Sequence, residues 1–143
     1  MAQTIDQAKT GDFENVAVIG FGLIGASFAA ALRAANPSAQ VMAVDTDLAT
    51  RVEAVNRGWA TATAAPDAAE FRAFIEDGCD LVVLATPVSV VEGYLKDLAE
   101  WGYRGIITDT ASTKSRIIEM AAHTLPYPQN FVPGHPMAGS EKN

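Results

Sequence analysis

The hydrophobic positions of the chain form short, uninterrupted runs separated by longer stretches with helical spacing. Four apolar runs rich in β-branched residues predict buried strands at Val16–Gly20, Val41–Asp45, Leu81–Ala85 and Ile106–Asp109. These runs are continuous rather than alternating, which is typical of parallel strands covered on both faces. Asn130–Gly134 is a weaker strand candidate, and Ala60–Ala62 is a candidate for a short edge strand.

The stretches between these runs predict helices, at Ile24–Ala35, Leu48–Arg57, Pro66–Asp77, Pro87–Trp101 and Ser112–Thr124. Asn36-Pro37 is a stop signal for the first helix, and Gly58 is a C-cap candidate for the second. Thr86 can cap the fourth helix, with Pro87 in its first position. Strands that alternate with helices indicate right-handed crossovers and a doubly wound parallel sheet in an α/β fold.

Composition limits the domain count and the classes of partner. The chain has 143 residues, which fits a single domain, and 49% of them are hydrophobic, as in a globular protein. Its formal net charge is −7 and its basic residues do not cluster, so nucleic acid and anionic membrane surfaces are poor partner candidates. No apolar run approaches the roughly 20 residues that a membrane-spanning helix needs.

The N-terminal segment and the single cysteine bear on localisation. Residues 1–14 are polar and lack the pattern of a secretory signal, so we expect a flexible lead-in followed by one domain over residues 15–143. Cys79 has no partner for an internal disulfide, which favours a reducing, cytoplasmic environment. Because Cys79 begins an apolar run, a small buried side chain is favoured over a catalytic thiol.

A glycine-rich loop joins the first predicted strand to the first predicted helix. Its sequence is Gly20-Phe21-Gly22-Leu23-Ile24-Gly25. In a dinucleotide-binding turn, Gly20 permits the tight bend, Gly22 leaves room for a pyrophosphate, and Gly25 lets the helix pack closely on the sheet. The first N–H groups of the helix would face that pyrophosphate. The strand–loop–helix context therefore predicts a Rossmann-type fold, with an ordinary strand–helix turn as the alternative.

An aspartate lies where such a fold places the ribose-binding carboxylate. Asp45 ends the second predicted strand, 20 residues after Gly25. Its charge would repel the additional phosphate of NADP, and Thr46 follows it where an arginine could have neutralised that phosphate, so NAD is the expected cofactor. Arg51 leaves NADP as a less favoured possibility. Asp45 could instead cap the second helix, although Asp47 suits that position better.

Polar residues also follow the later strands, at the sheet edge where open α/β sheets bind ligands. Thr86 and Pro87 would lie beside the nicotinamide half of a cofactor. His135 is an acid–base candidate because its ordinary pKa lies near neutrality, with a structural loop histidine as the alternative. Ser112 can contact a ligand or simply cap its helix. We expect no metal site.

Two further residues of this edge remain ambiguous. Asp109 can cap the last helix or order the loop in front of it. Lys114 opposes the dipole of that helix, a small misfit that hints at an anionic ligand. His123 lies late in the same helix, where a favourable charge at the helix end accounts for it.

Four sequence blocks together resemble the prephenate/arogenate (cyclohexadienyl) dehydrogenases of tyrosine biosynthesis. The blocks are Val18–Ser27, Asp80–Val88, Asp109-Thr110-Ala111-Ser112-Thr113-Lys114 and Gly134-His135-Pro136-Met137-Ala138-Gly139-Ser140-Glu141. The first block is common among dehydrogenases, whereas the last two in this spacing are quite specific. The resemblance extends from Asn15 to the end of the chain.

The resemblance implies oxidative decarboxylation of prephenate or arogenate with NAD(P) as the hydride acceptor. It implies that His135 accepts the proton of the substrate's ring hydroxyl and that Ser112 orients the substrate and the histidine. Thr113 would join them in the substrate site. Family members continue into a helical domain that supplies dimer contacts and basic groups. We therefore expect an N-terminal cofactor domain that is inactive or weakly active in isolation and that forms a homodimer only with that domain.

Two other functions remain open at this point. Other Rossmann dehydrogenases, of the β-hydroxyacid dehydrogenase and imine reductase type, share the glycine motif but place their acid–base residues elsewhere. The alternative that is not an enzyme is an NAD-sensing module, and the short length of the chain supports it. The sequence does not separate prephenate from arogenate as the substrate.

Overall fold

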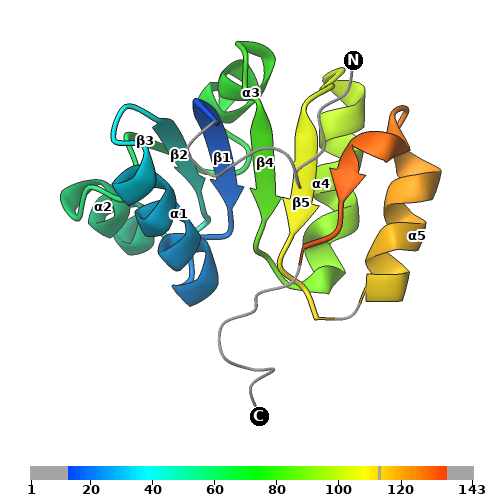
Figure 1. Ribbon diagram of the computed structural model, residues 1–143, viewed down its shortest axis with the longest axis horizontal. Coiled ribbons are helices and arrows are strands. Elements are labelled where there is room, and N and C mark those ends of the chain that lie inside the picture. Colours follow the sequence, from blue (N-terminus) through cyan, green and yellow to red (C-terminus); the bar gives the residue numbers. More distant parts are fainter. Residues whose placement is uncertain (1–12, 113, 135–143) are drawn as a thin grey trace.

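The computed structural model describes residues 13–112 and 114–134, which form a parallel sheet flanked by helices (Figure 1). The strands are β1 Asn15–Ile19, β2 Gln40–Val44, β3 Ala62–Ala64, β4 Leu81–Leu84, β5 Ile106–Asp109 and β6 Phe131–Val132. The helices are α1 Leu23–Ala35, α2 Leu48–Asn56, α3 Ala69–Glu76, α4 Val88–Glu100 and α5 Lys114–Thr124, with a 3₁₀ turn, η2, at Pro128–Asn130.

The strand order is β3-β2-β1-β4-β5-β6, and every pairing is parallel. The chain starts in the middle of the sheet, runs outward to β3, and returns beside β1 to build the other half. Val18 pairs with Ala43 on one side and with Val83 on the other. The connections leaving β1 and β4 therefore diverge, which makes the carboxyl ends of these strands the switch point of the sheet. The predicted doubly wound Rossmann-type fold is confirmed.

Both faces of the sheet are covered. Alternate residues of β1 point to opposite sides: Val16 and Val18 pack in the core beneath α1 and α2, whereas Ala17 and Ile19 pack against α3, α4 and α5. All four are completely buried. Figure 1 shows α1 and α2 beside β1–β3, with α4 and α5 beside β4–β6. Burial on both faces explains why the strand sequences are continuously apolar.

The helix ends test the predicted start and stop signals. Asp47 caps α2 by accepting the N–H of Thr50 at 2.9 Å, and Gly58 follows the helix with a φ of 75°. The predicted capping by Thr86 is wrong. Pro87 itself occupies the N-cap of α4, so Thr86 lies one residue too early and no side chain caps the helix.

Cys79 is a structural residue, as predicted. Its side chain is buried, its thiol donates a hydrogen bond to the carbonyl oxygen of Leu81 at 3.3 Å, and the hydroxyl of Tyr103 lies 3.9 Å from its sulfur. Burial raises the pKa of the thiol to about 11, which keeps it protonated and unreactive at neutral pH. Phe13, ahead of β1, is also buried and packs in the core beneath α1 and α2.

Within residues 13–112 and 114–134, none of the helices combines the length and apolar character needed to span a bilayer.

Candidate functional site

A cavity of about 400 Å³ opens at the switch point of the sheet. Loops that follow β1, β2 and β4 line it together with one face of α4; the lining residues are Gly20, Gly22, Val44, Asp45, Thr46, Ala85, Thr86, Pro87, Val90 and Tyr94. A larger hollow of about 540 Å³ lies on the flank of α2, but that single helix provides its whole lining. The cavity at the switch point is the candidate ligand site because polar groups from separate loops converge there.

The glycines of the first loop have distinct steric roles. Gly20 has a φ of +89°, and a Cβ atom there would lie 2.7 Å from the carbonyl oxygen of Ala85. A Cβ atom on Gly25 would collide with the carbonyl oxygen of Gly20, so this glycine sets the close approach of α1 to β1. A Cβ atom on Gly22 would meet nothing within 4 Å. The space next to Gly22 is therefore open, as a site for a pyrophosphate requires.

The N-terminus of α1 is arranged to accept an anion. Gly22 is the N-cap, no side chain caps the helix, and its first turn holds no acidic residue. The unpaired N–H groups and the helix dipole therefore favour a negative group at this end. Of the other predicted loop residues, Leu23 is 84% exposed and Ile24 43%, whereas the Phe21 side chain is buried in the core; these three are not among the residues that line the cavity.

Asp45 joins the second strand to this loop. The Phe21 N–H donates to Asp45 Oδ2 at 2.8 Å, and the Asp47 N–H donates to Asp45 Oδ1 at 2.9 Å. Each carboxylate oxygen has a further lone pair for a ligand hydroxyl. The Arg51 guanidinium donates to the main-chain oxygen of Asp45 at 2.7 Å. The half-buried carboxylate thus lies beside the cavity, where its negative charge disfavours a phosphate group placed directly against it.

Thr86 contributes a polar atom without a partner. Its Oγ1 is buried and forms no hydrogen bond within the described part of the chain. Thr86 lines the cavity, and its methyl group lies close to Gly20. Leaving a buried hydroxyl unsatisfied costs about 1–3 kcal/mol, so a polar ligand group in this cavity would stabilise the arrangement. The cavity therefore fits a ligand with a polar group at Thr86 better than a purely apolar one.

Sequence reasoning missed five residues of the cavity lining: Val44, Thr46, Ala85, Val90 and Tyr94. Val90 and Tyr94 lie four residues apart on α4, so they share the face of the helix that looks into the cavity. Desolvation raises the pKa of Tyr94, and the charge of Asp45 adds to this effect, followed by that of Asp97. The i, i+4 spacing directly after Pro87 is the signal that could have identified this face.

Further along the same edge, the loops after β5 and β6 meet at Asp109. The Gly134 N–H donates to Asp109 Oδ1 at 3.2 Å, and the Ala111 N–H donates to Oδ2 at 2.9 Å. Lys114 forms an ion pair with Oδ2 at 2.7 Å. The anion that Lys114 was expected to signal is therefore a side chain of the protein itself. Asp109 orders the loop, which was one of its two expected roles.

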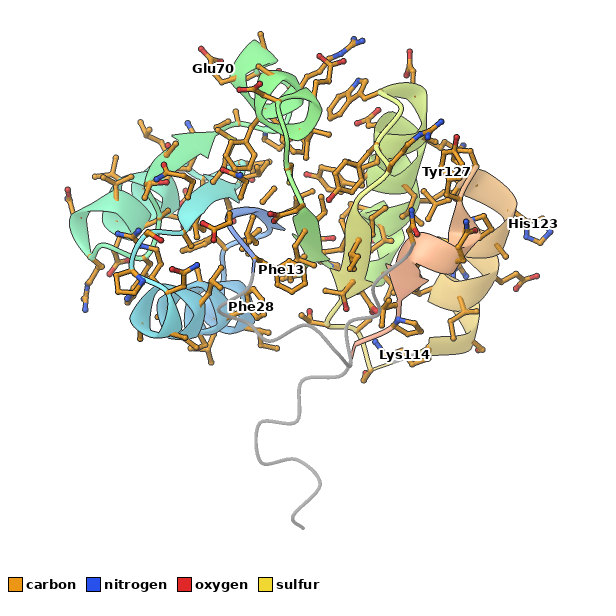
Figure 2. The ribbon with its side chains drawn as sticks, turned by 45° about the horizontal axis from the view of Figure 1, so that its top comes forward. Phe13, Phe28, Glu70, Lys114, His123 and Tyr127 are labelled. Atoms are coloured by element: carbon orange, nitrogen blue, oxygen red, sulfur yellow. The ribbon has the colours of Figure 1, made fainter. Side chains whose placement is uncertain are left out.

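Of the three predicted substrate-site residues, Ser112, Thr113 and His135, the structure describes Ser112. Ser112 is exposed in the loop before α5. Thr113 and His135 fall outside the described residues, although the neighbouring Gly134 is described. Figure 2 shows Lys114 at the ligand-binding end of the sheet and His123 projecting outward from α5.

Comparison with known proteins identifies the family. The family model described as "Prephenate dehydrogenase, nucleotide-binding domain" matches residues 28–143. The chain belongs to this family. Among curated members, the prephenate dehydrogenase of Bacillus subtilis is 33% identical over 133 residues, which cover 91% of this chain and 34% of that protein. The cyclohexadienyl dehydrogenase of Zymomonas mobilis is 34% identical over 134 residues, covering 92% and 43%, respectively.

Solved structures of the prephenate dehydrogenase family share the fold. Prephenate dehydrogenase from Aquifex aeolicus, in complex with hydroxyphenyl propionate and NAD⁺, superposes with a TM-score of 0.77 and 28% identity. The superposition covers 90% of this chain and 43% of that chain. This chain therefore spans less than half the length of these relatives and corresponds to their nucleotide-binding domain.

Proposed function

We propose that this chain is the cofactor domain of an enzyme that oxidatively decarboxylates prephenate, arogenate or both, with NAD as the hydride acceptor, in the cytoplasm. The observation that carries the proposal is the cavity at the switch point, lined by the glycine loop and Asp45, in a member of the prephenate dehydrogenase family. The A. aeolicus relative binds NAD⁺ and hydroxyphenyl propionate, which supports the same pair of ligand classes here.

The cofactor would be held by residues from three loops. The open space at Gly22 and the uncapped N-terminus of α1 suit the pyrophosphate, and the free lone pairs of Asp45 suit the ribose hydroxyls. The unpartnered hydroxyl of Thr86, next to Pro87, suits a polar group of the nicotinamide half. The bound cofactor would supply the hydride acceptor that the side chains of the protein lack.

The acid–base work would fall to His135. A neutral imidazole can accept the proton of the substrate's ring hydroxyl while a hydride leaves the same carbon. Loss of the carboxylate as CO₂ then yields an aromatic ring. Ser112 would orient the hydroxyl and the imidazole, with Thr113 beside it. Hydrogen bonds from Gly134 and Ala111 to one carboxylate support the proximity of the two loops that carry these residues.

The decisive experiment uses the complete protein that contains this chain. We expect NADH to form with prephenate or arogenate, and His135→Asn to lower kcat by at least about 100-fold while NAD affinity is unchanged. His123→Asn is the matched control, because His123 is exposed on α5 and its Nδ1 atom pairs with the Glu119 carbonyl oxygen of the same helix. A His135→Asn variant with normal kcat, or wild-type protein that oxidises neither compound, would contradict the proposal.

The chain of 143 residues should turn over substrate weakly or not at all by itself. It spans only 34–43% of the curated relatives, so most of each relative lies outside the matched segment. Robust oxidation of prephenate or arogenate by the purified, monomeric 143-residue chain would contradict this expectation.

A further inference from the structure

The loops that follow β5 and β6 converge on one buried carboxylate, that of Asp109. Its side chain is fully buried and accepts three hydrogen bonds from three separate places. Ala111 lies in the loop after β5, Lys114 is the first residue of α5, and Gly134 follows β6. A single group therefore determines how these three segments lie relative to one another.

Gly134 brings the two loops into direct contact. A Cβ atom on Gly134 would lie 2.5 Å from the main-chain oxygen of Asp109 and 2.7 Å from Thr108 Oγ1. Any other residue would have to push the loop after β6 away from the end of β5. The hydrogen bond from the Gly134 N–H and this tight packing therefore fix the same junction in two independent ways.

The charge of Lys114 belongs to this junction. A cation in the first turn of a helix is unfavourable to the helix dipole, so α5 itself gains nothing from this lysine. A buried carboxylate without a partner is far more unfavourable, and Lys114 Nζ lies 2.7 Å from Asp109 Oδ2. Lys114 is thus the counter-ion of the buried Asp109 side chain.

We propose that Asp109, paired with Lys114, is a positioning residue that holds the loop carrying Ser112 against Gly134, the residue before His135 in the chain. This inference rests on the proposed function. Its oxygen Oδ2 holds the chain on both sides of Ser112, through Ala111 and Lys114. Its oxygen Oδ1 holds Gly134, the residue directly before His135 in the chain. Displacements of about 1 Å between reacting groups lower rates by about 100-fold, so this control affects catalysis without substrate contact.

The test is Asp109→Asn in the complete protein. An asparagine has one acceptor oxygen, and its amide is a donor, so at least one of the three donors at this site would face another donor. We expect kcat for prephenate or arogenate to fall by about 10- to 100-fold, with KM and the affinity for NAD within about twofold of wild type. Amide hydrogen exchange at Gly134 and Ala111 should accelerate by at least about tenfold, because their acceptor is weakened.

Asp80→Asn is the matched control. The Asp80 carboxylate also accepts two main-chain N–H groups, those of Glu14 at 3.1 Å and Asn15 at 3.2 Å, but at the opposite edge of the sheet. Its replacement removes a similar contact and should leave kcat unchanged. Lys114→Arg should retain most of the activity because it preserves the positive charge.

A second variant separates positioning from simple stability. Asp109→Asn combined with Lys114→Met removes both charges, so it should recover resistance to urea relative to Asp109→Asn alone while kcat stays low. Recovery of kcat together with stability would overturn the inference. Normal kcat in Asp109→Asn, or unchanged exchange at Gly134, would also overturn it. Wild-type protein inactive on both substrates would overturn the proposed function and this inference together, whereas accelerated exchange at Gly134 would still identify the contact.

Discussion

Two aspartates, Asp45 and Asp109, occupy corresponding places in the two halves of the sheet. Asp45 directly follows β2, and Asp109 ends β5. In both, one carboxylate oxygen accepts the N–H of the residue two positions later, and the other accepts an N–H from the loop after the neighbouring strand. Each aspartate therefore ties its own loop to an adjacent one at the ligand-binding edge.

The two aspartates differ in their surroundings. The Asp109 side chain is fully buried and forms an ion pair with Lys114, so its charge is neutralised within the protein. Asp45 is half-buried, lines the cavity, and forms no ion pair within residues 13–112 and 114–134. The same hydrogen-bond pattern can thus serve two purposes. A closed carboxylate fixes the loops, and an open one presents its charge to a ligand.

The largest expected difference between the two aspartates is in stability. Asp109→Ala leaves Lys114 without its anion and two main-chain N–H groups without acceptors, so we expect the free energy of unfolding to fall by about 3 kcal/mol or more. Asp45→Ala removes hydrogen bonds at a partly solvated site and should cost about 1 kcal/mol. Urea denaturation at neutral pH measures both values. Equal losses would contradict the distinction between a closed and an open carboxylate.

For the affinity for NAD, we expect the larger effect from the substitution of Asp45. Asp45→Ala removes a charged acceptor for the ribose hydroxyls, so NAD affinity should fall by about 30- to 100-fold, equivalent to about 2–3 kcal/mol. NADP affinity should fall less, because the repulsion of its additional phosphate is also lost. Calorimetric titration with each nucleotide provides the measurement. Asp47→Ala is the control, since this exposed residue caps α2 and does not line the cavity; if it weakened NAD binding equally, the assignment to Asp45 would fail.

The success of sequence reasoning differed between these regions for physical reasons. Strands buried on both faces require continuous apolar runs, so β5 was predicted with its observed bounds. The edge strand β3 lies two residues later than predicted, because its sequence Ala-Thr-Ala carries little hydrophobic signal. The segment predicted as Asn130–Gly134 contains a shorter strand, β6, preceded by a 3₁₀ turn.

The candidate site was predicted where local chemistry is sufficient. The glycine loop, Asp45 and Thr86 converge on one cavity because strand ends and turn geometry fix their positions. The pairing of Lys114 with Asp109 and the contribution of Tyr94 were not predicted. Both depend on how a helix is rotated against the sheet, which tertiary packing determines and a short motif does not encode.

The glycines of the two regions allow a finer comparison. Gly134→Ala places a methyl group against the main chain of Asp109, so it should lower the free energy of unfolding by about 1–2 kcal/mol. A Cβ atom on Gly22 meets nothing within 4 Å, so Gly22→Ala should lose only the modest N-cap preference of glycine over alanine while weakening NAD binding. Thermal unfolding of both variants measures the change in stability, and calorimetric titration measures the change in NAD affinity. If the Gly134→Ala variant is as stable as the wild type, and amide hydrogen exchange at residues 111 and 134 is not accelerated, the junction tolerates a side chain.

The smallest expected effect concerns the charge that Asp45 places on the cavity. Desolvation and then the charge of Asp45 raise the pKa of Tyr94 above its ordinary value of 10.0. Asp45→Asn should therefore lower the pKa of Tyr94, but not to its ordinary value, because the desolvation of the hydroxyl remains. Tyrosinate absorbance during a pH titration follows the change, with Tyr94→Phe identifying the signal of this residue. Asp109→Asn is the control, since the charges that act on Tyr94 are those of Asp45 and Asp97.

The sign of the accompanying stability change follows from the raised pKa. Tyr94 favours the folded state while its hydroxyl is protonated; this contribution is complete below pH 10 and is lost as the pH rises through the folded-state pKa. In Asp45→Asn the loss should begin at the same pH, because the unfolded-state pKa is unchanged, but it should be smaller and should end at a lower pH than in the wild type. If the pKa of Tyr94 is the same in Asp45→Asn and in the wild type, the charge of Asp45 does not act on the cavity. The Asp45 carboxylate would then resemble that of Asp109, whose charge is neutralised within the protein.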